Sequence, residues 1–426
     1  MLKDDIEQRF DVIVVGGGAA GFFCALEIAR QNPKLRITIL EKSNKVLGKV
    51  KVSGGGRCNV THNCFEPRAL AGHYPRGARH LKNLFRHFHS GDMVRWLQER
   101  GVNVHAEEDG RMFPVTNDSQ TIVNCFLQEA SRFGIRIQMG EAVTRIEGVA
   151  PEFCLTTITS REFRARRILI ATGGNPNLPA YQFISDLGHA IKKPIPSLFT
   201  FNDATKGFTD LMGLAVRDAT VRIEGTRISQ QGPVLITHWG LSGPAVIKLS
   251  AWAAEYLHAS AYKFRVYVNW CGGISEEEIR STLDDHRRLR GKQSITGNAL
   301  FGIPIRLWNR LCALAEIPEA KIWSELPKKS MNRLIEFLIR CPFDMAGKTT
   351  YKEEFVTCGG VPLSEIDSER MESRLVKGLF FAGEVLDIDG ETGGFNFQAA
   401  WTTGYLAAHA IASDLAQGQN QEEGTP

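Results

Sequence analysis

The stretch Asp11–Glu41, DVIVVGGGAAGFFCALEIARQNPKLRITILE, decides the fold of the chain around it. It opens with Val12–Val15, a short apolar run of the kind that forms a parallel strand buried on both faces. Gly16, Gly18 and Gly21 follow at once in the spacing G-x-G-x-x-G. The first glycine makes a tight turn, the second lets the backbone approach a pyrophosphate, and the third lets a helix lie close to the strand. The stretch therefore predicts a dinucleotide-binding unit.

A helix and a second strand complete this unit. We expect the helix over Ala19–Gln31, with Ala20 in a first turn whose N–H groups face phosphates. The strand Arg36–Leu40 ends in Glu41, followed by Lys42, where an acid is expected to accept hydrogen bonds from ribose hydroxyls. The alternative is an ordinary glycine turn, and the order strand, glycines, helix, strand and acid argues against it. This stretch alone does not decide between NAD and FAD.

Length and composition indicate a large protein of mild positive charge. The 426 residues suffice for two or three domains, and 43% of them are hydrophobic and can fill the cores. A net charge of +4 is too small to indicate a nucleic-acid-binding protein by itself. The 9 cysteines contain no C-x-x-C pair, which indicates neither a disulfide framework nor a zinc site. No apolar run approaches the roughly twenty residues of a membrane span, and no signal-peptide core is present, so we expect a cytoplasmic protein.

A second glycine-rich loop follows Gly48 and Lys49. It reads SGGGRCN, and three consecutive glycines do not suit the interior of a helix or strand, so their N–H groups are expected to face a bound group. The cation, thiol and amide that follow form a plausible pocket wall. We consider Cys58 as a catalytic acid or nucleophile, against the alternative of a cysteine that only packs. The loop residues are Ser53, Gly54, Gly55, Gly56, Arg57, Cys58 and Asn59.

Two later segments again place glycines after a strand. Arg167–Gly174, RILIATGG, predicts a buried strand whose small final residues let a cofactor pass close by, a pattern common in FAD-binding chains. Gly378–Gly404 predicts a strand, the pair Gly383 and Glu384, a glycine-rich loop and a helix that begins near Gly394. The N-terminal end of that helix would favour negative charge on a reduced flavin ring.

The middle of the chain has a different character. Beyond Pro194 and Pro196, short strands surround a helix expected over Pro244–Leu257, which predicts a compact β-barrel or sandwich. Residues 275–341 then show apolar positions near the helical period and predict a helical subdomain. Within the β-rich part, His238 precedes a helix start. We consider it a general acid or substrate contact, against the alternative of a structural histidine bonded within a turn.

Positive charge is concentrated in Arg68–His89, RALAGHYPRGARHLKNLFRHFH, which contains no acid. One interpretation is a solvated basic face beside a phosphate-rich cofactor. The other is a surface that receives an anionic substrate such as RNA. In the second interpretation Arg76, Arg79, Lys82 and Arg86 would contact phosphates.

Together these motifs resemble the two-dinucleotide-binding FAD flavoproteins and, more narrowly, the HI0933-like family, also called the BaiN or aminoacetone oxidase-like family. The chain departs from the family pattern only near Lys49, where KVLGKVKVSGGG has valines in place of an Arg-Lys-Leu-like stretch. The resemblance rests on Gly16–Gly21 with Glu41, Ser53–Asn59, GRMFP at Gly110–Pro114, ATGG at Ala171–Gly174, THWGLSGPA at Thr237–Ala245, TCGGV at Thr357–Val361 and GEVLDIDGETGGFNFQAA at Gly383–Ala400.

The resemblance implies an α/β fold: a Rossmann-like FAD-binding domain of the glutathione-reductase kind, with an inserted β-barrel and a helical subdomain. We expect the FAD-binding domain in two parts, residues 1–194 and 343–426, around a barrel at 195–272 and helices at 273–342. FAD would bind non-covalently. Members of the family are associated with oxidation of small amines, with reduction of steroid-like enones and, for a ribosomal branch, with reduction of uridine to dihydrouridine.

The motifs narrow the chemistry. A second G-x-G-x-x-G is missing, which excludes a dedicated NADPH domain, and the lack of C-x-x-C argues against a disulfide reductase. NAD(P)H would then be a transient electron donor that visits the flavin face used by the substrate. Our main hypothesis is an FAD-dependent oxidoreductase that passes hydride to an activated C=C bond, with Cys58 or His238 as proton donor. The alternatives are a ribosomal RNA dihydrouridine synthase, a small-amine oxidase, or a flavin-binding assembly protein without turnover.

The substrate would be a small molecule or a nucleoside, with no membrane partner and no metal site. The residues expected to hold FAD lie on the glycine loops, at the strand ends, beside the adenine and at the start of the final helix. They are Gly16, Gly18, Ala19, Ala20, Gly21, Glu41, Lys42, Gly48, Lys49, Ser53, Gly54, Gly55, Gly56, Arg57, Asn59, Ala142, Val143, Ala171, Thr172, Gly173, Gly174, Gly383, Glu384, Asp389, Gly393, Gly394, Phe395 and Asn396.

Overall fold

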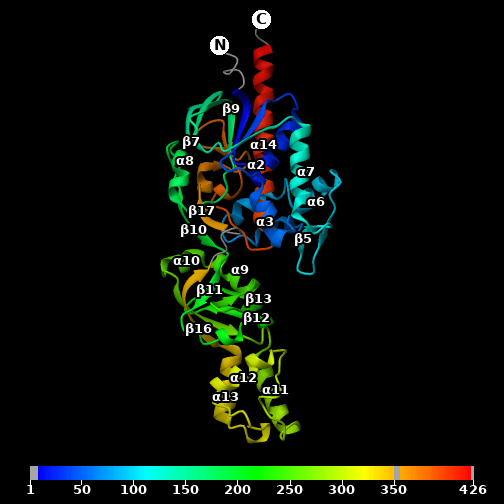
Figure 1. Cartoon of the computed structure of the whole chain (residues 1–426), viewed down its shortest axis with the longest axis vertical. Helices are drawn as coiled ribbons and strands as arrows, with labels where there is room; N and C mark the ends of the chain where they lie inside the picture. Colours follow the sequence, from blue (N-terminus) through cyan, green and yellow to red (C-terminus); the bar gives the residue numbers. More distant parts are fainter. Residues whose placement is uncertain (1–7, 350–355, 424–426) are drawn as a thin grey trace. The chain divides into compact units, whose positions relative to one another are not determined.

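The computed structural model describes residues 8–349 and 356–423. The described residues form two compact units (Figure 1). We call the first, within Met1–Pro196 and Lys352–Pro426, the cofactor unit, and the second, within Ser197–Tyr351, the barrel unit. The run TYKEEFVTCGGVPL, which begins at Thr350, has the composition of a strand, and its residues 350–355 lie outside the described residues.

A parallel sheet forms the centre of the cofactor unit. Its strands follow the order β20-β9-β1-β2-β6 and all run in the same direction. The predicted apolar run belongs to β1, which pairs with β2 on one side and β9 on the other, so both of its edges are covered. Every residue of the run is buried, so both of its faces are covered as well. The strands are β1 (Arg9–Val15), β2 (Ile37–Glu41), β6 (Arg136–Met139), β9 (Glu162–Ile170) and β20 (Leu379–Phe381).

Antiparallel strands extend this sheet and form two smaller ones. Strands β7, β8 and β9 form an antiparallel meander at one edge, and β18-β19-β20 extends the other edge. Strands β3, β5 and β4 form a three-stranded sheet, and β10 pairs with β17. Their bounds are β3 (Thr61–His62), β4 (Val104–Ala106), β5 (Arg111–Pro114), β7 (Val143–Val149), β8 (Glu152–Thr157), β10 (Lys192–Ser197), β17 (Val356–Gly360), β18 (Ile366–Asp367) and β19 (Glu372–Ser373).

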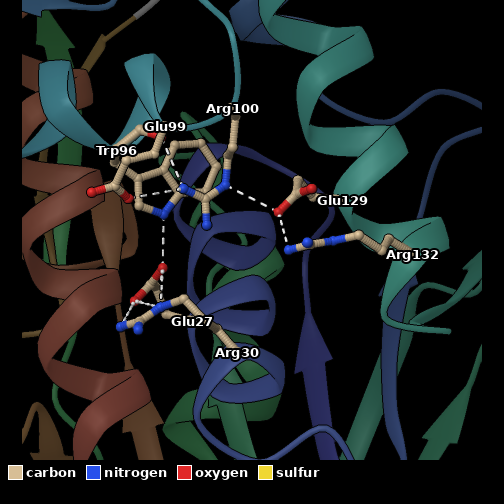
Figure 2. Close-up of polar contacts among 7 residues, drawn as sticks. All are labelled: Glu27, Arg30, Trp96, Glu99, Arg100, Glu129 and Arg132. Atoms are coloured by element: carbon tan, nitrogen blue, oxygen red, sulfur yellow. Dashed lines mark hydrogen bonds and ion pairs between the residues drawn. The ribbon is translucent and has the colours of Figure 1, made fainter.

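The first and last helices of the described chain lie side by side in this unit. Helix α2 spans Ala19–Gln31, as predicted, and packs along α14, Phe395–Glu423 (Figure 1). Every residue from Ala20 to Ala29 is buried, including Glu27. Figure 2 shows how the carboxylate of Glu27 is satisfied there, by Arg30 of its own helix and by the indole N–H of Trp96.

Shorter helices complete the cofactor unit. They are α3 (Gly48–Gly56), α4 (Pro67–Ala71), α5 (Ala78–Leu84), α6 (Ser90–Gln98), α7 (Ser119–Arg132) and α8 (Gln182–Ser185), with 3-10 helices η1 (Leu178–Tyr181), η4 (Leu363–Glu365) and η5 (Gly383–Val385). Among the helices of residues 8–349 and 356–423, none has the length and apolar character required to cross a membrane.

The barrel unit is a closed antiparallel barrel with helices. The barrel follows the order β11-β14-β13-β12-β15-β16, which decides the predicted choice between barrel and sandwich. The helix predicted over Pro244–Leu257 is interrupted at Ala253, so α9 and α10 are separate. The elements are β11 (Thr200–Asp203), η2 (Thr209–Leu211), β12 (Ala215–Ile223), β13 (Ser229–Ile236), β14 (Gly240–Ser242), α9 (Pro244–Trp252), α10 (Ala254–Ala259), β15 (Lys263–Asn269), α11 (Glu276–Leu289), α12 (Ile305–Leu314), η3 (Trp323–Glu325), α13 (Lys328–Ile339) and β16 (Cys341–Thr349).

The predicted fold class is confirmed, but the boundary expected between residues 342 and 343 falls inside a strand. Strand β16 runs from Cys341 to Thr349 and pairs with both β15 and β11, which closes the barrel. The barrel therefore includes residues that the sequence assigned to the second part of the FAD-binding domain. The physical reason is that barrel closure needs a last strand, and that strand follows the helices in the chain.

Candidate functional site

The first glycine loop brings the ends of two strands against α2. Gly16 has a φ of +113°, and a Cβ atom on it would lie 2.4 Å from the carbonyl oxygen of Ala171. A Cβ on Gly21 would lie 2.1 Å from the carbonyl oxygen of Gly16, which is the close approach predicted for the third glycine. A Cβ on Gly18 would meet nothing within 4 Å, so the loop is open at the N-cap of α2. An open helix N-terminus suits a pyrophosphate group.

Glu41 ends β2 with its carboxylate held by backbone donors. Oε2 accepts from the N–H of Gly17 at 2.8 Å, and Oε1 accepts from the N–H of Ser43 at 2.9 Å. The N–H of Glu141 donates to the carbonyl of Glu41 at 2.9 Å, which places the expected adenine contacts, residues 142 and 143, beside it. The role of Gly17 was missed from the sequence, although it is the middle glycine of the run GGG.

The SGGGRCN loop interrupts a helix. Helix α3 is assigned through Gly56, but Ser53, Gly54 and Gly55 leave the helical conformation, as three glycines led us to expect. Arg57 pairs with Glu107 at 2.6 Å and lies 4.0 Å above the ring of Phe113. The loop is therefore held by contacts to the β4–β5 hairpin.

Asn59 connects this loop to the start of α14. With its amide oxygen oriented toward Gly394, its side chain accepts from the N–H of Gly394 and donates to the carbonyl of Thr61, each at 3.0 Å. A Cβ on Gly394 would lie 2.5 Å from that same carbonyl oxygen, so the two segments are in close contact. The SGGGRCN and TGGFN motifs, more than 330 residues apart, thus form one site wall.

Cys58 is completely buried and has a left-handed backbone conformation, with a φ of +61°. Burial raises the pKa of its thiol to about 12, although a hydrogen bond with Ser53 acts in the opposite direction. The thiol is therefore neutral at physiological pH, which opposes a role as a thiolate nucleophile. Its role as a proton donor stays a prediction.

Glu384 joins three of the predicted motifs. Its Oε2 lies 2.6 Å from Lys49 Nζ, and its Oε1 accepts from the N–H of Thr357 at 2.8 Å. A Cβ on Gly174 would lie 2.5 Å from Thr357 Oγ1 and 2.7 Å from Glu384 Oε1. The ATGG, TCGG and GE segments therefore meet at one place. Within the described part of the chain Thr357 Oγ1 is buried without a hydrogen-bond partner, as expected for a group that faces a polar ligand atom.

The loop before α14 is closed by Asn396. Its side chain accepts from the N–H of Gly390 at 2.8 Å and donates to the carbonyl of Gly390 at 3.0 Å. Phe395, the first residue of α14, is buried and packs against two histidine rings, with ring centroids 4.5 Å from His62 and 4.2 Å from His73. Neither histidine is predicted as a site residue from the sequence, where His73 is only one residue of the basic segment.

One of the expected phosphate contacts is wrong. Arg76 is paired with Asp389 through both carboxylate oxygens, and the side chains are 11% and 0% exposed. Arg76 is therefore not available to RNA, because its guanidinium serves a buried carboxylate. The expected contact of Asp389 with the cofactor stays a prediction.

The other cations of the basic segment lie at the surface. Arg79, Lys82 and Arg86 are exposed and have the spacing i, i+3, i+7 along α5 and the turn that follows it. This spacing places Arg79 and Lys82 on one face of α5, and Arg86 lies in the turn after it. We call these three residues the basic stripe.

His238 lies in the barrel unit, in the turn between β13 and β14. It is exposed, and its ring lies edge-on to Trp239 with centroids 4.3 Å apart. Trp239 is fixed by donation from Nε1 to Thr200 Oγ1 at 3.0 Å. The predicted role of His238 toward a substrate stays a prediction.

Comparison with known families decides the classification. The model described as HI0933-like protein Rossmann domain matches residues 10–410. The chain belongs to the HI0933-like family. Membership confirms the family resemblance of the motifs, and it makes the protein an FAD-dependent oxidoreductase.

Named relatives align with nearly the whole chain. The ribosomal RNA dihydrouridine synthase of Escherichia coli is 30% identical over 417 residues, which cover 96% of this chain and 98% of that protein. The protein of the same name from Haemophilus influenzae is 29% identical and covers 96% and 100%. The 3-dehydro-bile acid delta(4,6)-reductase of Clostridium scindens is 26% identical and covers 94% and 98%.

Solved structures share the fold at low identity. The 3-ketosteroid delta1-dehydrogenase of Sterolibacterium denitrificans gives a TM-score of 0.52 at 12% identity and covers 96% of this chain and 100% of that chain. The 3-ketosteroid-delta4-(5alpha)-dehydrogenase of Rhodococcus jostii gives 0.50 at 13% identity and covers 95% and 97%.

The residues of the cofactor unit fit FAD. The loop is open at Gly18, a carboxylate at Glu41 ends β2, and the unpartnered hydroxyl of Thr357 lies where three motifs meet. In this HI0933-like chain these positions suit a pyrophosphate, a ribose and a polar atom of the cofactor in turn.

Proposed function

We propose that this protein passes hydride from NADPH or NADH, through FAD, to an activated C=C bond. The main support for the proposal is that the ATGG, TCGG and GE segments meet at Glu384. The same unit also has an open glycine loop at the N-terminus of α2. The sequence contains a single G-x-G-x-x-G motif, so the nicotinamide and the acceptor would use the flavin in turn. A relative from Clostridium scindens is named as a reductase of a bile acid, which supports this reaction class.

The cofactor would lie along the carboxyl ends of the parallel strands. Glu41 would accept from ribose hydroxyls, and the N-terminus of α2 at Gly18 would face the pyrophosphate. Lys49 and Thr357, both bonded to Glu384, would face the part of FAD nearer the ring. When bound, FAD supplies hydride transfer at its N5 atom. The chain's own residues orient it and exclude water.

Anaerobic stopped-flow spectroscopy tests the proposal. The purified holoprotein is expected to be yellow, and NADPH or NADH should bleach the flavin absorbance. A 3-oxo-4-ene steroid, or ribosomal RNA from cells that lack the gene, should then restore it. Bleaching by an amine but not by a nicotinamide would instead indicate an amine oxidase. A flavin that neither donor reduces would contradict the proposal and favour a binding protein without turnover.

A second, more specific candidate is reduction of a uridine in ribosomal RNA. The C5=C6 bond of uridine is conjugated with a carbonyl group and is therefore an activated C=C bond. The basic stripe, Arg79, Lys82 and Arg86, supports an RNA partner, and relatives from two organisms carry this name. Such a substrate would place the protein in the cytoplasm.

Nucleoside analysis of ribosomal RNA tests this candidate. RNA from cells without the gene should lack one dihydrouridine that wild-type RNA contains. Purified protein with FAD and NADPH should restore that nucleoside in the isolated RNA. Identical dihydrouridine content in the two strains would contradict the RNA substrate but leave reduction of a small-molecule C=C bond open to the stopped-flow test.

A further inference from the structure

A histidine and a carboxylate form a pair at the start of α14, and neither has a role in the function proposed above. His73 Nδ1 lies 3.1 Å from Glu391 Oε2, and the N–H of Glu391 donates to the carbonyl of His73 at 2.9 Å. A carboxylate only accepts hydrogen bonds, so Nδ1 carries a proton. The tautomer is therefore fixed, and Nε2 is the ring nitrogen that Glu391 leaves open to proton exchange.

The surroundings hold this imidazole in one orientation. The rings of His73 and Phe395 are nearly parallel, with an angle of 13° and centroids 4.2 Å apart. Phe395 is itself fixed, because Tyr74 donates its hydroxyl to the Phe395 carbonyl at 2.6 Å and the His62 ring packs against the Phe395 ring. Packing and one hydrogen bond together limit rotation of the His73 ring, which is the arrangement that positioned acids require.

Burial differs between the two members of the pair. The Glu391 side chain is 7% exposed, whereas that of His73 is 35% exposed. The carboxylate is thus an internal support and the imidazole is accessible. Both residues belong to the cofactor unit. Phe395, which packs on His73, is the last residue of the TGGF segment, and the family pattern assigns that segment to FAD binding.

His73 is better suited to proton donation than the cysteine of the sequence hypothesis. Cys58 is completely buried, and its pKa of about 12 makes proton release slow near neutral pH. Imidazole is the side chain that most often donates and accepts protons near neutral pH. The carboxylate behind it orients the ring, as in other histidine–carboxylate pairs.

We propose that His73, oriented by Glu391, donates the proton that completes reduction of the C=C bond, an inference that rests on the proposed function. Hydride, with two electrons, passes from the reduced flavin to one carbon and forms a C–H bond. The π pair of the C=C bond then takes a proton from His73 Nε2 at the neighbouring carbon. The substrate is reduced, the flavin is left oxidised, and His73 is left neutral until it regains a proton from water. NADPH or NADH supplies the two electrons for the next cycle.

Separate measurement of the two half-reactions tests the inference on the FAD-loaded protein. The variants are His73→Gln and Glu391→Gln, with His105→Gln as the matched control in β4. Reduction by NADPH is recorded first, and reoxidation by ribosomal RNA from cells that lack the gene, or by a 3-oxo-4-ene steroid, is recorded second. We expect His73→Gln to slow reoxidation by about 10²–10⁴-fold, because a positioned acid is lost. Its reduction rate, FAD content and flavin spectrum should match those of wild type.

The outcomes separate the inference from the function on which it rests. Glu391→Gln keeps the imidazole but weakens its support, so it should slow reoxidation less than His73→Gln, and it remains informative if His73→Gln does not fold. Wild-type reoxidation rates in both variants would overturn the proton-donor role. Equal losses in both half-reactions, together with loss of FAD, would also overturn it and indicate a structural pair. Reduced wild-type protein that neither acceptor reoxidises would contradict the proposed function, and the role of His73 would fall with it.

Discussion

Trp96 donates its indole N–H at 2.7 Å to the carboxylate of Glu27 (Figure 2). Glu27 lies on α2, the helix that follows the first glycine loop. Glu27 is 1% exposed, and Arg30 is its second partner at 2.8 Å. Arg100 lies 3.7 Å above the Trp96 ring and continues the network to Glu129 at 3.0 Å. One set of polar contacts therefore connects α2 with α6 and α7. This satisfies a carboxylate in a helix that is otherwise buried among apolar groups.

Trp96→Phe should lower the free energy of unfolding by about 1–3 kcal/mol, because it keeps an aromatic ring but removes one donor from a buried carboxylate. Urea denaturation measures the loss. Arg132→Ala is the control, since Arg132 pairs with Glu129 but is 61% exposed, and its change should stay below about 1 kcal/mol. Equal losses in the two variants would contradict a special role for the Trp96–Glu27 bond.

Arg76→Met should be more damaging, because it removes the cation from a completely buried Asp389. Breaking a buried ion pair from one side costs about 3–5 kcal/mol. The double variant Arg76→Met with Asp389→Leu removes both charges and should recover a large part of that loss. Guanidinium denaturation of the two variants decides the point. A double variant that is no more stable than the single one would show that the charge left behind is not the cause.

Stability should fall in alkaline solution. Burial raises the pKa of Cys58, Cys271, Cys312 and Cys341 from the ordinary value of 9.0 to about 12. Between these values the unfolded chain has released protons that the folded chain retains, so stability is complete below pH 9 and is lost as the pH rises toward 12. Each thiol contributes a slope of about 1.4 kcal/mol per pH unit in that window. Urea midpoints near pH 8 and pH 10 should differ accordingly, and identical midpoints would contradict the burial of these thiols.

The basic stripe should give RNA binding a measurable salt dependence. Replacing Arg79, Lys82 and Arg86 by alanine should weaken binding of ribosomal RNA at low salt and reduce the slope of log K against log salt by roughly one per lost phosphate contact. Filter binding over a range of salt concentrations gives both slopes. Lys34→Ala is the control, since Lys34 is another exposed cation of the cofactor unit. Equal slopes for the stripe variant and the control would exclude the stripe as the RNA surface.

The sequence predicted those parts of the fold that local pattern controls. Strand β1, the glycine loop and the limits of α2 follow from residues within one short stretch, where each glycine has a steric reason. The end of the barrel was not predictable in this way. Strand β16 belongs to the barrel because β11 and β15 pair with it, and that pairing is not visible in its own residues.

The polar side chains of the site show the same limit. Arg76 was counted as a surface cation, but its acid lies 313 residues further along the chain. His73 was counted as one charge among several, and its partner Glu391 is 318 residues away. Composition records that a cation or an imidazole is present. Whether that side chain faces solvent, a phosphate or a buried carboxylate depends on which distant segments of the chain pack against it.

The late position of β20 and α14 in the chain has a consequence for synthesis of the protein. Strand β9 ends at Ile170, yet its neighbour β20 begins at Leu379, and α14, which covers α2, begins later still. A ribosome adds about 5–20 residues per second, so β20 follows β9 after about 10 to 40 seconds. During that interval the nascent chain presents one unpaired edge of a parallel sheet and the face of α2 that α14 later covers. We therefore expect the unfinished chain to depend on chaperones, and a ribosome stalled within the barrel unit to produce an aggregating fragment that does not bind FAD.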